Sequence, residues 1–148
     1  MGALEEAFLF YRVTRYDLHG KALLKTNPKE YIVDTGFRTW MAGYRVTDTG
    51  RLFENAVYLQ LLYEGWSVHV GKLYGKEVDF VAVKDGRVLY VQATDEMRAS
   101  ETREREIAPL KSIRDNHEKI VVARQGSYDT DIDDFGAGYS VRTAENAE

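Results

Sequence analysis

Three polar residues at separate places in the chain could together bind a divalent cation. Glu54 lies in an expected helix, Asp79 in an apolar run, and Gln92 in the apolar run that follows. Two carboxylates and an amide oxygen are hard ligands of the kind that Mg²⁺ or Mn²⁺ binds. A cation held beside a phosphodiester can activate water and stabilise developing charge. The pattern therefore predicts a metal-dependent phosphodiesterase site, with Glu54 and Asp79 as metal ligands and Gln92 in support.

The segment 84–87 (Lys-Asp-Gly-Arg) separates two apolar runs and predicts a β-hairpin. Asp-Gly is a favoured pair for the two-residue type I′ turn. If these two residues form the loop, counting back along both strands places Asp79 directly opposite Gln92. Opposed residues in an antiparallel pair share a face, with Cβ atoms roughly 5 Å apart. A carboxylate and an amide are thus expected to meet inside a buried sheet.

A helix is expected over residues 48–64, ended by Gly65. Its apolar residues surround nearly the whole circumference, which is typical of a buried helix. Glu54 lies on the stripe that also carries Val57 and Leu61. Because this stripe is apolar, Glu54 is expected to point inward.

Three strands should follow this helix, and the middle one is apolar on both faces apart from Asp79, as in an interior strand. The expected elements are strands over 8–16 and 30–33, a short helix over 37–42, strands over 67–73, 76–83 and 87–94, a helix over 102–114, and strands over 118–123 and 139–142. Their order, αβββαβ after the first hairpin, predicts an α/β (α+β) fold with a mixed central sheet and flanking helices.

The composition is that of a soluble globular protein. The chain has 148 residues, 44% apolar and 30% charged, enough for one domain with a real core. No apolar run approaches the roughly 18 residues of a membrane helix, and no signal-peptide pattern is present. Cysteine is absent, which excludes disulfides and thiolate metal sites. We therefore expect a cytoplasmic protein without a membrane partner.

Charge is distributed unevenly along the chain, whose net charge is −4. The first strands carry Arg12, Arg15, Lys21 and Lys25 among tyrosines, whereas the segment after Gln125 is acidic. Basic side chains interleaved with aromatic ones on a hairpin can follow a phosphate backbone. An ordinary solvated hairpin would show the same pattern. We expect the four cations to contact nucleic acid without reading its sequence.

The order of the three polar residues resembles the site of PD-(D/E)XK nucleases, which combine a helix Glu, a strand Asp, and Asp or Glu followed two residues later by Lys. Gln92 and Thr94 stand where that acid and Lys would be. The resemblance implies a restriction-endonuclease-like core with a Mg²⁺ or Mn²⁺ site at Glu54 and Asp79. Thr94 leaves a positive charge missing. The sequence offers four side chains to supply it without selecting one: Lys72, Lys76, Arg103 and Arg105.

A wider resemblance covers about residues 4–123. The segments that carry it are Glu6-Ala7-Phe8-Leu9-Phe10, Arg15-Tyr16-Asp17-Leu18-His19-Gly20-Lys21, Tyr31-Ile32-Val33-Asp34-Thr35-Gly36, Gly50-Arg51-Leu52-Phe53-Glu54-Asn55, Gly71-Lys72-Leu73, Lys76-Glu77-Val78-Asp79-Phe80-Val81, Tyr90-Val91-Gln92 and Glu101-Thr102-Arg103-Glu104-Arg105-Glu106. They look like the uncharacterised domain that lies C-terminal to the ATPase module of many prokaryotic AAA-type ATPases.

That resemblance implies a partner in the parent protein, its own N-terminal ATPase module, followed by a winged-helix element. Residues 1–34 would be a basic hairpin left from this element, and residues 35–148 an endonuclease-like domain with an acidic tail. The chain looks cut from a larger protein just before Met1, and it contains no Walker motif of its own.

Two functions and a purely structural alternative remain open. The domain could bind nucleic acid, with metal-dependent phosphodiesterase activity weak or lost. It could instead be a catalytically inert interaction or assembly module of its ATPase. In the structural alternative, Asp79 and Gln92 hydrogen-bond across the sheet and Glu54 pairs locally, because buried polar groups need partners.

Overall fold

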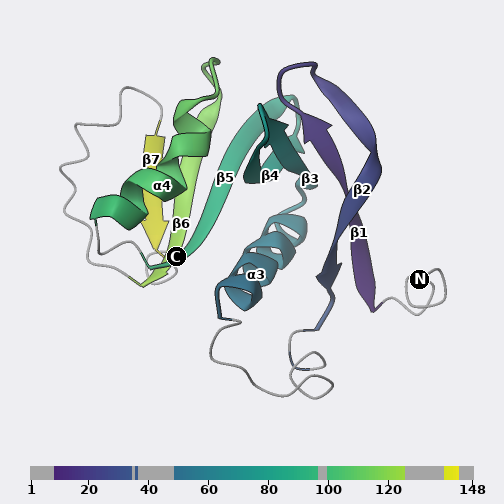
Figure 1. Ribbon diagram of the computed structural model, residues 1–148. Coiled ribbons are helices and arrows are strands. Elements are labelled where there is room, and N and C mark those ends of the chain that lie inside the picture. The colour runs from purple at the N-terminus through teal and green to yellow at the C-terminus, as the bar shows by residue number, and fades with distance from the viewer. Residues whose placement is uncertain (1–8, 35, 37–48, 97–99, 126–138, 144–148) are drawn as a thin grey trace.

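The structure is a computed structural model that describes residues 9–34, 36, 49–96, 100–125 and 139–143. Along the chain its elements are β1 (Phe10–Asp17), β2 (Ala22–Ile32), α3 (Thr49–Tyr63), β3 (Ser67–Leu73), β4 (Lys76–Lys84), β5 (Arg87–Glu96), α4 (Ser100–Lys111), β6 (Glu118–Gln125) and β7 (Tyr139–Thr143) (Figure 1). The helix expected over 37–42 and the acidic stretch 126–138 lie outside the described residues.

The described strands form one seven-stranded sheet in the order β2-β1-β3-β4-β5-β6-β7. The pairs β1/β2, β3/β4 and β4/β5 are antiparallel, and β1/β3, β5/β6 and β6/β7 are parallel. The predicted mixed sheet with helices on its flanks is therefore confirmed, as is the order αβββαβ from α3 to β6. The strand predicted to be interior, β4, lies at the centre of the sheet.

The hairpin β1–β2 belongs to the same sheet as the rest of the chain. Its first strand pairs in parallel with β3, where Arg15 lies opposite Val70 and Tyr16 opposite Gly71. Val13 and Tyr31 of this hairpin are buried in the core. The segment expected as a lead-in, 1–34, and the domain expected to follow it thus share one sheet and one core in the described part of the chain.

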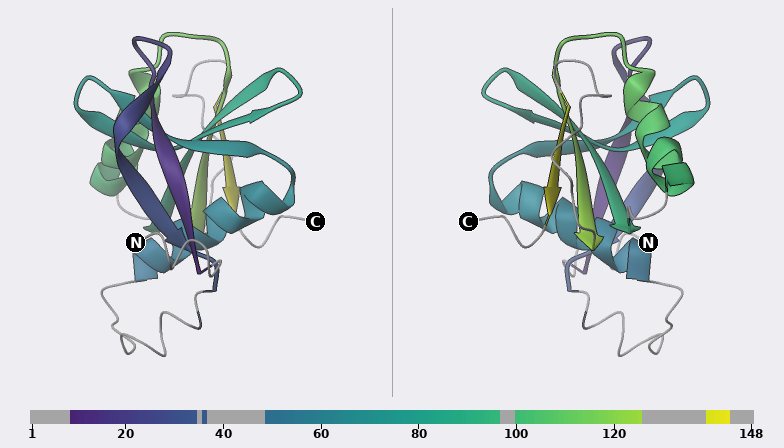
Figure 2. Two further views of the ribbon diagram at one scale, coloured as in Figure 1. Left: turned by 90° about the vertical axis from the view of Figure 1, so that its right-hand side faces the viewer. Right: turned by 90° about the vertical axis from the view of Figure 1, so that its left-hand side faces the viewer.

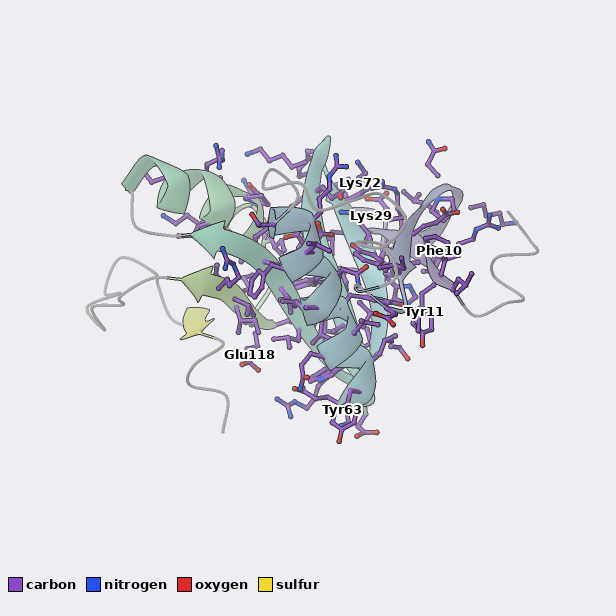
Figure 3. All side chains as sticks on the ribbon, turned by 90° about the horizontal axis from the view of Figure 1, so that it is seen from below. Phe10, Tyr11, Lys29, Tyr63, Lys72 and Glu118 are labelled. Atoms are coloured by element: carbon purple, nitrogen blue, oxygen red, sulfur yellow. The ribbon has the colours of Figure 1, made fainter. Side chains whose placement is uncertain are left out.

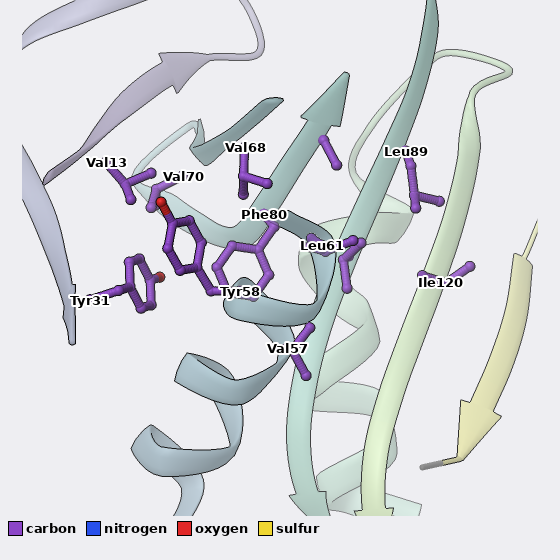
Figure 4. Close-up of a cluster of buried hydrophobic side chains, with 12 residues drawn as sticks. Val13, Tyr31, Val57, Tyr58, Leu61, Val68, Val70, Phe80, Leu89 and Ile120 are labelled. Carbon is purple, nitrogen blue, oxygen red and sulfur yellow. The ribbon is translucent and has the colours of Figure 1, made fainter. Parts of the chain in front are cut away.

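Two apolar clusters lie on the two faces of the sheet. The α3 cluster combines that helix with one face and includes Val57, Tyr58, Leu61, Phe80, Val91 and Ile120 (Figure 4). The α4 cluster lies on the other face and includes Val78, Val81, Tyr90, Ile107, Leu110 and Val121. Alternation along β5 makes the division visible, because Val91 belongs to the α3 cluster and Tyr90 to the α4 cluster. Two views from opposite sides, each turned by 90° from Figure 1, show how α3 and α4 cover this twisted sheet (Figure 2).

Local signals act as predicted at the end of α3 and at the β4–β5 turn. Gly65 has φ +84°, and the N–H groups of Gly65 and Trp66 bond to the carbonyls of Leu62 and Leu61, which is the Schellman pattern. Asp85 and Gly86 have positive φ, as a type I′ turn requires. The register of β4 and β5 is therefore the predicted one, without a shift by one residue.

Candidate functional site

Asp79 lies on a β-bulge of the central strand. His69 pairs with Val81, but Gly71 pairs with Val78, so two residues of β4 stand opposite one residue of β3. The two are Asp79 and Phe80. A bulge changes which face the following side chains occupy. It is the reason that Val78 belongs to the α4 cluster while Phe80 belongs to the α3 cluster.

Asp79 and Gln92 meet as predicted, but each side chain bonds to the backbone of the neighbouring strand. On the side of the turn, the neighbouring residues Phe80 and Val91 pair with each other, as the predicted register requires. The Asp79 N–H donates to Oε1 of Gln92 at 3.3 Å, and the Ala93 N–H donates to Oδ2 of Asp79 at 2.8 Å. Hydrogen bonds from side chain to backbone therefore link β4 and β5 beyond the last backbone pair, Phe80 and Val91. Gln92 alternates with Val91 and so faces the α4 side of the sheet.

Glu54 points inward from α3, as its position on the apolar stripe predicted. Its Oε1 accepts a hydrogen bond from the Tyr31 hydroxyl at 2.6 Å and lies 2.6 Å from Nζ of Lys29. Tyr31 itself stacks on Tyr58, with ring centroids 4.4 Å apart (Figure 4). The carboxylate predicted to be a metal ligand thus already accepts from a phenol and an ammonium.

The same ammonium joins Glu54 to a second carboxylate. Nζ of Lys29 donates to Oε1 of Glu77 at 2.9 Å, and the Arg15 guanidinium bonds to Oε2 of Glu77. Lys72 lies 3.5 Å from the same carboxylate, and Figure 3 labels it beside Lys29. We call Arg15, Lys29, Tyr31, Glu54, Lys72 and Glu77 the Lys29 cluster.

The electrostatics of the Lys29 cluster favour its charged form. Partial burial opposes ionisation of Glu77, but hydrogen bonds from Arg15 and Lys29 outweigh it and lower the pKa of Glu77 to about 2. Burial also opposes the ammonium of Lys29, yet the two carboxylates hold the pKa of Lys29 above its usual value. Burial, and then the negative charge of Glu54, raises the pKa of Tyr31, so its hydroxyl stays a donor.

Lys29 is the functional residue that the sequence reasoning missed. The sequence offers four other side chains for the positive charge absent at Thr94, and of these Lys72 does lie beside Glu77. Arg105 is exposed, and the side chain of Arg103 is not described. A signal for Lys29 existed, because Lys29 and Tyr31 are two apart on one strand and must share a face.

Asn55 is a second polar residue that the sequence reasoning missed. It is buried on α3, where its Oδ1 accepts from the Ile32 N–H and its Nδ2 donates to the Ile32 carbonyl, both at 2.8 Å. The side chain thereby imitates a neighbouring strand and ties α3 to the end of β2. This contact helps to place Glu54, the preceding residue of the helix, beside Lys29.

The four predicted nucleic-acid contacts differ in their surroundings. Lys21 and Lys25 are exposed near the turn of β1–β2, and half-exposed Arg12 lies 3.9 Å from Glu30. Arg15 is held inside the Lys29 cluster, where its Nε also donates to the Asn27 carbonyl at 2.6 Å. Lys21 and Lys25 thus face solvent, whereas Arg12 lies beside Glu30 and Arg15 has a structural partner.

The donor set does not fit a divalent cation as it stands. Among the described residues, no three carboxylate or imidazole side chains converge closely enough to share a metal ion. Oε1 of Glu54 already receives two hydrogen bonds, and the ammonium of Lys29 fills the space between Glu54 and Glu77.

No helix of the described part is both long and apolar enough to cross a membrane.

Comparison with known proteins finds a relative in Haemophilus influenzae. An uncharacterized protein of Haemophilus influenzae (strain ATCC 51907 / DSM 11121 / KW20 / Rd) is 42% identical over 138 residues, which cover 93% of this chain and 34% of that protein. The chain therefore spans about a third of the length of that relative. No family model and no solved structure match the chain.

Proposed function

We propose that this chain is a nuclease-like domain of a larger prokaryotic AAA-type ATPase that binds nucleic acid and has weak or lost metal-dependent phosphodiesterase activity. The observation that carries the proposal is the position of Lys29. Its ammonium lies 2.6 Å from Glu54 and 2.9 Å from Glu77, where a phosphodiesterase would hold a cation. Lys29, together with Arg15 on Glu77, balances the charge of the two acids and makes the site compatible with a nearby phosphate without requiring a metal.

Exposed cations on the first hairpin support nucleic-acid binding. Arg12, Lys21 and Lys25 belong to β1, β2 and the turn between them, a hairpin that joins the rest of the sheet through β3. Cations on a hairpin can contact successive phosphates and release counterions. Such binding would place a strand across the domain without sequence preference.

Membership of a larger protein is supported by the length of the relative. About two thirds of the Haemophilus influenzae protein lies outside the matched region, which leaves room for an ATPase module. The PD-(D/E)XK core is supported by the αβββαβ order, the interior position of β4, and the meeting of Asp79 with Gln92. The ATPase module is the expected partner within that protein.

A second candidate function is an assembly module for the ATPase. A groove of about 580 Å³ runs between α3 and the sheet, lined among others by Phe53, Ala56, Leu61, Leu89, Ile120 and Val122. Apolar side chains in an open groove are typical of protein contacts. This candidate predicts binding to the ATPase module and no affinity for nucleic acid.

The test is fluorescence anisotropy of labelled single-stranded and duplex DNA over a range of salt concentrations. We expect salt-dependent binding in the presence of EDTA, and a smaller salt slope, by about one per cation, for Lys21→Ala and Lys25→Ala. Arg51→Ala, which removes an exposed cation from α3, is the matched control and should leave the slope unchanged. Absence of binding to either DNA would overturn the proposal in favour of the assembly module.

A further inference from the structure

A second cavity, of about 290 Å³, lies on the face of the sheet that carries the α4 cluster. Its floor is the part of β3, β4 and β5 that bears His69, Val81 and Tyr90. The turn of β1–β2 forms one wall and the connection from α4 to β6 forms the other. Figures 1 and 2 place this turn and this connection at the same end of the sheet. The cavity is separate from the Lys29 cluster, which lies on the α3 side.

Four rings surround this cavity: Tyr16, His69, Tyr90 and His117. The Tyr16 and His69 centroids are 6.4 Å apart, and the Tyr90 and His117 centroids are 6.2 Å apart. Aromatic rings from both walls and from the floor thus line the cavity, together with aliphatic side chains of the floor. This composition suits a flat, aromatic guest, because planar rings gain most from stacking or edge contacts with another ring.

Hydrogen bonds to neighbouring residues fix the positions of the polar groups in the cavity. The Tyr90 hydroxyl donates to Oδ2 of Asp115 at 2.7 Å, and the N–H of His117 donates to Oδ1 of the same carboxylate at 3.1 Å. Nδ1 of His69 is within 2.8 Å of the Thr14 hydroxyl. Burial lowers the pKa of His69, so its imidazole is neutral near pH 7. Fixed hydroxyl, carboxylate and imidazole groups offer both donors and acceptors to a ligand edge.

Lys21 completes the arrangement as the cation of the wall formed by the β1–β2 turn. A nucleotide combines a flat aromatic ring, an edge of mixed donors and acceptors, and an attached phosphate. Each of these has a counterpart here, in the rings, the polar groups and Lys21 respectively. Aromatic platforms beside basic side chains are how proteins bind unstacked bases of single strands.

We infer that this cavity receives a nucleobase whose phosphate contacts Lys21, supplied either by an unstacked position of a single strand or by a free nucleotide. In its single-strand form the inference rests on the proposed function, since the β1–β2 turn that carries Lys21 also carries the phosphate contacts. It adds a base-binding site on the side of the sheet away from Glu54.

The experiment compares oligo(dT) with an abasic strand of the same length by fluorescence anisotropy. Tyr16→Leu removes a ring while keeping the apolar packing of a half-buried position, and His117→Ala removes an exposed ring. We expect each to weaken oligo(dT) binding about tenfold, as loss of one base stack does, and to leave the abasic strand unchanged. Tyr63→Leu, at a tyrosine 89% exposed on α3, is the control and should change neither. Circular dichroism melts verify that each variant is folded.

Thymidine monophosphate separates the two sources of the base. It should shift the imidazole NMR signals of His69 and His117 in the wild type and not in Tyr16→Leu. Shifts with the mononucleotide but no binding of either strand would support the cavity and overturn nucleic-acid binding. Equal affinity for oligo(dT) and the abasic strand, unchanged in Tyr16→Leu and without imidazole shifts, would overturn the cavity and leave the salt-dependent binding standing.

Discussion

The Nζ of Lys29 lies 2.6 Å from Oε1 of Glu54, so the acid expected to bind a metal ion is paired with an ammonium from another strand. Lys29 also reaches Glu77 on the central strand. One cation thus connects β2, α3 and β4. The ammonium bridges two converging carboxylates as a metal ion would, and Arg15, which bonds to Glu77, supplies the second positive charge.

Removing that ammonium should destabilise the fold. In Lys29→Met the carboxylates of Glu54 and Glu77 lose their shared partner while keeping the cost of partial burial. Because all three side chains are 16–30% exposed, we expect a loss of about 1–3 kcal/mol in the free energy of unfolding, less than for a fully buried pair. Urea denaturation measures it. Lys84→Met, which removes a lysine near the β4–β5 turn, should cost less; equal losses would contradict the bridging role.

Loss of the Asn55 side chain should lower the free energy of unfolding nearly as much as loss of a core side chain. Asn55→Ala leaves both backbone groups of Ile32 without this partner, and unsatisfied buried groups cost about 1–3 kcal/mol each before water or relaxation compensates. We expect a loss of about 2–4 kcal/mol in urea denaturation. Gln60→Ala on the exposed side of the same helix is the control, with less than about 0.5 kcal/mol expected. A loss as small as that of the control would show that Asn55 does not tie α3 to β2.

Short-range rules predicted most of the elements and the pairing of one adjacent pair of strands. Gly65 ended α3, and the Asp85-Gly86 turn fixed the register of β4 and β5, because both signals act within a few residues. The inward direction of Glu54 followed from helical periodicity. The seven-stranded sheet was less predictable, since nothing within β1 specifies that it pairs with β3.

The interior of the candidate site was predicted only in part. Asp79 and Gln92 do meet, yet the bulge that positions Asp79 results from the pairing of β4 with β3, which local sequence does not encode. Lys29 is 25 residues before Glu54 in the chain and reaches it only because β1 and β2 join the sheet. Contacts between distant elements depend on topology, so residue type alone pointed to the acids and not to their partner.

Stability should fall at acidic pH through Glu77. Its pKa in the folded state is about 2, below the ordinary value of 4.5. The folded state therefore binds fewer protons, and the stabilisation is complete above pH 4.5 and is lost as the pH falls toward 2. We expect about 1–2 kcal/mol of loss across this window after solvent screening. Glu77→Gln should reduce that pH dependence in urea denaturation between about pH 2.5 and about pH 5; an unchanged profile would assign the loss to other acids.

The effect of Mn²⁺ on Tm should show whether Lys29 prevents Glu54 and Glu77 from binding a metal ion. In the wild type, the ammonium of Lys29 lies between Glu54 and Glu77, so Mn²⁺ should leave Tm unchanged. Lys29→Met removes the competing charge, and Mn²⁺ at about tenfold its Kd should then raise Tm by about 3–6 °C, because only the folded state presents both acids together. Glu54→Gln in the Lys29→Met background should abolish the rise. A Tm increase in the wild type that disappears in Asp79→Asn would instead show that Asp79 binds metal with Lys29 in place, and cleavage would then have to be sought as an active function.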